Sequence, residues 1–79
     1  MLKVQLTPRR VLYAELEPDN GTNKGGFYCR VFEDEECAQE KDYGITIRKE
    51  EIPQSITDAN ERRKKAIKLA DEKIRKLYK

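Results

Sequence analysis

The chain has 79 residues, with 17 Lys and Arg, 15 Asp and Glu and no His, for a formal net charge of +2 at pH 7. Charged residues make up 41% and hydrophobic residues 37%, against about a quarter and close to half in typical soluble domains. The length allows one small domain, residues 1–79, and the absence of His excludes His-based catalysis, metal ligation and pH switching.

The first two segments alternate apolar and polar side chains with a period of two, which is typical of half-buried β-strands. Residues 2–6 predict a short first strand that Thr7-Pro8 ends, and residues 11–17 predict a second strand. Turn residues from Pro18 to Gly21 stop the second strand. Together with Gly25-Gly26, they indicate a loose hairpin connection to the next strand.

The third strand, residues 27–32, gives the strongest strand signal because it is rich in aromatic and β-branched residues. A shift of one residue in its register would exchange its faces. It leads into a run of four acids, Glu33 to Glu36, which we expect to face solvent. The two possible inward faces are both largely apolar: Phe27, Cys29 and Val31, or Tyr28, Arg30 and Phe32.

The last part of the chain changes from strand to helical periodicity. Residues 43–48 predict a fourth strand, residues 49–55 a linker, and residues 56–78 an amphipathic helix. Ser55 is the predicted helix cap, with Asp58 in the position of a capping-box partner. The apolar stripe of the helix comprises Ala59, Ala66, Ile67, Ala70, Ile74 and Leu77.

These elements predict an α+β fold: a small antiparallel sheet of three to four strands, about residues 2–48, followed by one C-terminal amphipathic helix packed on one face. In layout alone, this order resembles the arm-binding domains of tyrosine recombinases and the partner-binding domains of some antitoxins, and no residue role is transferred from them. The predicted core comprises Leu12, Leu16, Cys29, Val31, Ile45, Ile47, Ile67, Ala70, Ile74 and Leu77.

No arrangement of residues predicts catalysis, so we expect no enzyme, no cofactor and no metal site. The only serine is the predicted cap, and Cys29 and Cys37 lack a His base. Glu33 to Glu36 are consecutive and therefore point in different directions, unlike the ligands of a calcium loop. Gly25-Gly26 lacks the Lys-Ser/Thr of a phosphate-binding loop.

The sequence favours a cytoplasmic protein without membrane contact. The N-terminus has no secretory pattern, and no apolar run approaches the roughly 20 residues of a membrane helix. Cys29 and Cys37 are expected to be reduced thiols, with Cys29 a small buried hydrophobic residue, although a bridge between them stays open.

The near-neutral total conceals a segregation of charge. Residues 11–42 carry nine acids and three bases, whereas residues 43–79 carry eleven bases and six acids. If the helix covers one face of the sheet, aromatic and Arg side chains of the types enriched in protein interfaces lie on the other face, beside the acids. The predicted protein-binding residues are Tyr13, Tyr28, Arg30, Phe32, Glu33, Asp34, Glu35 and Glu36.

The alternative is nucleic-acid binding by the basic start of the helix, whose side chains would bind phosphates. Four adjacent bases spread around a helix, however, so a solvated helix face accounts for the same pattern. Self-association through the open face or an edge strand is a further alternative. A compact, highly charged protein of this kind suits a small regulator of phage or accessory type. The alternative nucleic-acid residues are Arg62, Arg63, Lys64, Lys65 and Lys68.

Overall fold

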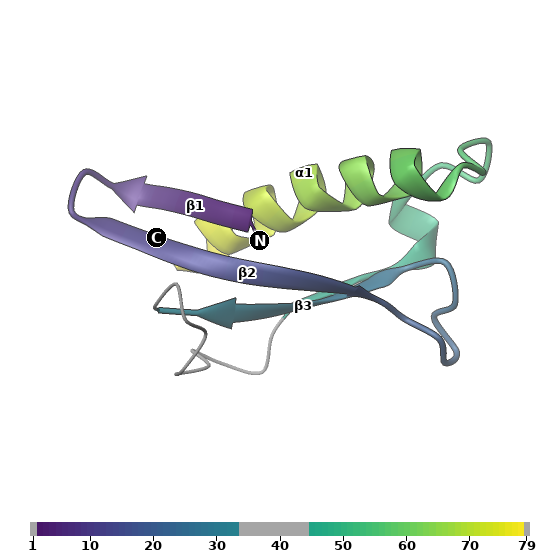
Figure 1. The fold of residues 1–79 in the computed structure, drawn as a ribbon, viewed down its shortest axis with the longest axis horizontal. Coiled ribbons are helices and arrows are strands. Elements are labelled where there is room, and N and C mark those ends of the chain that lie inside the picture. Colours follow the sequence, from purple (N-terminus) through teal and green to yellow (C-terminus); the bar gives the residue numbers. More distant parts are fainter. Residues whose placement is uncertain (1, 34–44, 79) are drawn as a thin grey trace.

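The computed structural model describes residues 2–33 and 45–78, which form a four-stranded antiparallel sheet and a C-terminal helix, confirming the predicted α+β fold. The strands lie in sequence order, and α1 crosses one face of the sheet (Figure 1). The elements are β1 (Leu2–Thr7), β2 (Arg10–Pro18), β3 (Phe27–Phe32), β4 (Ile45–Ile47), the 3₁₀-helix η1 (Lys49–Glu51) and α1 (Ala59–Leu77).

Strand register decides which face of β3 packs against α1. Cys29 pairs with Leu16 on one side and with Ile45 on the other, and Leu12 pairs with Val4. Since directly paired residues point to the same face of a sheet, these side chains form one apolar surface. The β3 residues in the core below α1 are Phe27, Cys29 and Val31.

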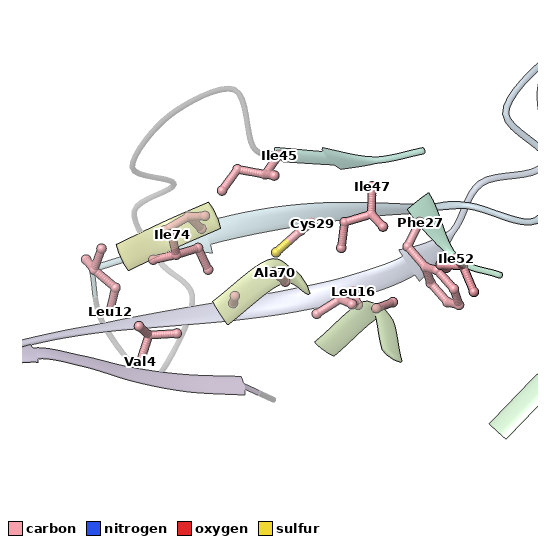
Figure 2. Packing of buried hydrophobic residues seen from close by; sticks show 13 residues of the cluster. Val4, Leu12, Leu16, Phe27, Cys29, Ile45, Ile47, Ile52, Ala70 and Ile74 are labelled. Atoms are coloured by element: carbon pink, nitrogen blue, oxygen red, sulfur yellow. The ribbon is translucent and has the colours of Figure 1, made fainter. Parts of the chain in front are cut away.

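The core draws on the sheet, on α1 and on the segment between them (Figure 2). Eight of the ten predicted core residues are buried, and Ile67 is half-buried against the cluster. The prediction for Leu77 was wrong, because its side chain is 62% exposed. Tyr78 packs against the core instead, four residues after Ile74. Buried residues beyond the prediction are Val4, Ala14, Phe27, Phe32, Ile52 and Ala66.

The helix begins later than predicted, and its cap is Asp58 rather than Ser55. Asp58 has extended backbone angles, and its Oδ2 accepts a hydrogen bond from the Glu61 N–H at 3.0 Å. Ser55 lies in a turn in which the Ile56 N–H donates to the Pro53 carbonyl at 3.0 Å. The chain therefore turns between residues 53 and 56 before α1 starts at Ala59.

Polar contacts hold α1 in place on the sheet at both of its ends. Near the C-terminal end, Arg75 Nη1 donates to the Gln5 carbonyl of β1 at 2.7 Å, and Arg75 Nε contacts Asp71 Oδ2 at 2.9 Å. Near the N-terminal end, Arg62 Nη2 donates to the carbonyl of Gly25 at 2.8 Å. The helix is thus anchored to β1 and to the connection between β2 and β3.

Two positions in the β2–β3 connection, 25 and 26, require glycine for specific structural reasons. Gly25 has a φ of 102°, a conformation that L side chains seldom adopt. A Cβ on Gly26 would overlap the side-chain amide of Asn23 and the carbonyl oxygen of Ile47. That close approach lets Asn23 Nδ2 donate to the Ile47 carbonyl at 3.1 Å, while Asn23 Oδ1 accepts from the Lys49 N–H at 2.9 Å.

Candidate functional site

The face of the sheet opposite α1, here called the helix-free face, carries alternating aromatic and charged residues. Its composition follows from the period of two in β2 and β3, whose other set of side chains fills the core. Directly opposed side chains lie within contact range across neighbouring strands. Between β2 and β3, the cross-strand pairs on this face are Tyr13 with Phe32, Glu15 with Arg30, and Glu17 with Tyr28. At its edges, Lys3 of β1 pairs with Tyr13, and Thr46 of β4 pairs with Tyr28.

The structure places the predicted protein-binding residues of the sheet on this face, but not all are accessible. Arg30 is exposed, and Tyr13 and Tyr28 are half-buried. The expectation that Phe32 presents an open surface was wrong, because Phe32 is only 6% exposed. Phe32 pairs with Tyr13 across β2 and β3.

The acidic part of the predicted site is described only at its first residue. Glu33 is exposed directly after Phe32, at the end of β3. Asp34, Glu35 and Glu36 lie outside the described residues. The described candidate surface is therefore Arg30 with Tyr13 and Tyr28 beside it and Glu33 at its border.

The basic start of α1 is not one continuous surface. Arg62 is half-buried and donates to three backbone carbonyls, those of Gly25, Pro53 and Ile56. Arg63 Nη2 donates to the Leu16 carbonyl at 3.4 Å. Successive residues of a helix point about 100° apart, which spreads the remaining side chains around α1. Lys64 forms an exposed ion pair with Glu61 at 3.4 Å, Lys65 is half-buried, and Lys68 is exposed.

Two lysines that the sequence pattern did not single out join Arg62 around an open concavity. Lys24 belongs to the β2–β3 connection and Lys49 to η1. The three residues are far apart in the sequence, and no motif links them. In the sequence, Gly25-Gly26 predicts a loop at this point, but it does not predict which distant residues this loop approaches in the fold.

Cys29, the described cysteine, is a free thiol in the core and is fully buried. Desolvation by burial raises its pKa to about 11, so the thiol stays protonated at neutral pH. Within residues 2–33 and 45–78, no three Cys, Asp or Glu side chains gather in a way that could hold a metal ion. In the same part of the chain, no helix is long and apolar enough to cross a membrane.

No protein-family model matches the chain, and no curated protein or solved structure is significantly similar to it.

Proposed function

We propose that this protein is a non-enzymatic binding module that docks a protein partner on its helix-free face. The observation that carries the proposal is the cluster around the exposed Arg30, which has half-buried Tyr28 two residues before it on β3 and half-buried Tyr13 diagonally across from it on β2. Tyr and Arg dominate protein interfaces because they bury a large contact area and lose little conformational entropy.

Carboxylates on the same face favour a protein partner over a nucleic acid. Glu15 and Glu17 follow Tyr13 along β2 on this face, and the exposed Glu33 lies just beyond the end of β3. Negative charges at these positions repel a phosphate backbone, but they attract and orient a protein with a basic surface. The partner we propose is therefore a protein that presents basic side chains to this face.

The proposal includes a regulatory role in the cytoplasm. A module that binds without reacting acts through its partner, by blocking or repositioning it. The free thiol of Cys29 suits a reducing compartment, in which thiols stay unpaired.

The test is affinity capture from an extract of the source cell with matched variants of the whole chain. We expect Arg30→Ala and Tyr28→Ala each to reduce capture of a specific partner by roughly tenfold or more. Lys68→Ala, which removes an exposed lysine of α1, should capture as the unmodified protein does. Urea unfolding of each variant confirms that the fold is retained.

Two results would contradict the proposal. Loss of the partner in Lys68→Ala but not in Arg30→Ala would place the interface on α1. A gel shift of single-stranded oligonucleotide at about 50 mM salt, weakened by Arg63→Ala and Lys68→Ala, would favour the nucleic-acid alternative. Light scattering at high protein concentration tests for self-association. If the protein forms a dimer and Arg30→Glu abolishes it, the partner on the helix-free face is a second copy of the chain.

A further inference from the structure

A concavity of ≈ 330 Å³ at the N-terminal end of α1 is lined by three cationic side chains from three separate segments. These are Lys24 of the β2–β3 connection, Lys49 of η1 and Arg62 of α1. Its other lining residues include Gln54 and Thr57, which can donate hydrogen bonds, and no carboxylate. We propose that this concavity binds a phosphate group, either free or at the end of a small phosphorylated molecule.

The three segments converge on Gly25. The position that a Cβ of Gly25 would occupy lies 3.5 Å from Arg62 Nη2 and 3.6 Å from Lys49 Cβ. The positive φ of Gly25 turns the chain at this point, and its carbonyl accepts a hydrogen bond from Arg62 Nη2 at 2.8 Å. The absence of a side chain on Gly25 therefore lets the Arg62 guanidinium and the base of the Lys49 side chain approach the backbone.

Arg62 is held in position before any ligand arrives. Its Nη1 donates to the carbonyls of Pro53 and Ile56 at 3.3 and 2.8 Å, in addition to the bond to Gly25. A guanidinium has five N–H donors, so two remain for a ligand. Carbonyl acceptors orient the group but leave its positive charge uncompensated. A side chain already ordered in this way loses little entropy when it binds an anion.

Three carboxylates that are near in the sequence, those of Asp58, Glu61 and Glu51, make their contacts outside the concavity. Asp58 caps α1 through the Glu61 N–H at 3.0 Å, and Glu61 pairs with Lys64 at 3.4 Å. Glu51 pairs with Lys73 at 2.8 Å. Glu50 and Glu51 line a neighbouring hollow with Arg48, and Lys49 borders both that hollow and the concavity. The concavity therefore has a local excess of positive charge.

A phosphate fits these donors better than a carboxylate does. Phosphate has more acceptor oxygens and a charge of about −1.5 to −2 at neutral pH, so it can accept from two lysines and a guanidinium together. The Lys49 ammonium already donates to the Thr22 carbonyl at 3.4 Å, which leaves two of its three donors free. The inference is independent of the proposed partner on the helix-free face.

The test is a titration of the ¹⁵N-labelled full chain with sodium pyrophosphate and with sodium phosphate, each compared with sodium chloride at equal ionic strength. We expect saturable shifts at the Gly25 and Lys49 amides and at the Arg62 Nε–H. Lys24→Gln and Lys49→Gln should each weaken binding by roughly tenfold. Lys68→Gln is the matched control, because it removes the same charge from an exposed site outside the concavity.

Each outcome decides the proposal. Equal weakening by Lys68→Gln, or equal shifts with chloride, would overturn it, since either would indicate general attraction between ions. Binding of a single-stranded oligonucleotide without binding of phosphate or pyrophosphate would also overturn it. Binding of both anions, lost in Lys49→Gln but not in Lys68→Gln, would support it.

Discussion

Lys73 Nζ lies 2.8 Å from Glu51 Oε1, so an ion pair connects the second half of α1 to η1. The other oxygen of Glu51, Oε2, accepts a hydrogen bond from the Arg48 N–H at 2.8 Å. The hydrogen bonds from Lys73 and from Arg48 hold the pKa of Glu51 below its ordinary value. The Glu51 carboxylate thus stabilises the turn of η1 and also fixes the position of η1 against α1.

Glu51→Gln should lower the free energy of unfolding by about 0.5–1 kcal/mol at neutral pH, since the side chains of the pair are 35% and 31% exposed and solvent screens them. A pKa lowered in the folded state gives stability that is present above the ordinary Glu pKa and lost as the pH falls. The difference between the variant and the unmodified protein in urea unfolding should therefore shrink as the pH falls below the ordinary Glu pKa. A difference that persists unchanged in acid would contradict this account.

Asp58→Ala should destabilise the protein by about 1 kcal/mol, because it leaves the Glu61 N–H in the first turn of α1 without its capping acceptor. Ser55→Ala is the matched control, and we expect it to change stability by less than about 0.5 kcal/mol, as an exposed surface substitution does. Urea unfolding of both variants distinguishes the two caps. A larger loss of stability in Ser55→Ala than in Asp58→Ala would contradict this account, because it would indicate that Ser55 caps the helix.

Burial of Cys29 predicts a loss of stability in alkali. Its pKa is raised from 9.0 to about 11, so above pH 9 the unfolded chain releases a proton that the folded chain retains. Between pH 7 and 10 the unmodified protein should lose about 1.4 kcal/mol more than Cys29→Ala does. Parallel losses in the two proteins would mean that other groups cause the alkaline effect.

Arg62→Lys should cost about 2 kcal/mol, because an ammonium cannot donate to the Gly25, Pro53 and Ile56 carbonyls from one planar group. Arg63→Lys is the control. Its guanidinium makes one hydrogen bond of 3.4 Å, to Leu16, and we expect a change below about 0.5 kcal/mol. Equal effects in urea unfolding would indicate that Arg62 contributes charge alone.

Sequence periodicity was sufficient to predict the strands, the helix and most of the core. Alternation in β2 gave Leu12 and Leu16, and spacings of four in α1 gave Ala70 and Ile74. The pattern of β3 does not predict which of its faces points inward, because both faces are largely apolar. Only the pairing of Cys29 with neighbours on both sides decides it, and such pairing is a property of the assembled sheet.

The remaining errors have local causes. Ser55 and Asp58 are both good caps, and the turn made by Pro53 decides between them. Leu77 continues the apolar stripe, yet the next residue, Tyr78, packs against the core in its place. The concavity was not predictable at all, since Gly25 and Arg62 are 37 residues apart and meet only in the folded chain.

The side chain of Asn23 has a consequence for the dynamics of β4. β4 has three residues, but the Asn23 amide bonds to the Ile47 carbonyl and to the Lys49 N–H as a neighbouring strand would. The Lys49 amide proton is therefore held by a side chain, and it should exchange with solvent deuterium more slowly than its place beyond the strand suggests. Its exchange rate would report whether this end of the sheet opens by itself or only with the whole domain.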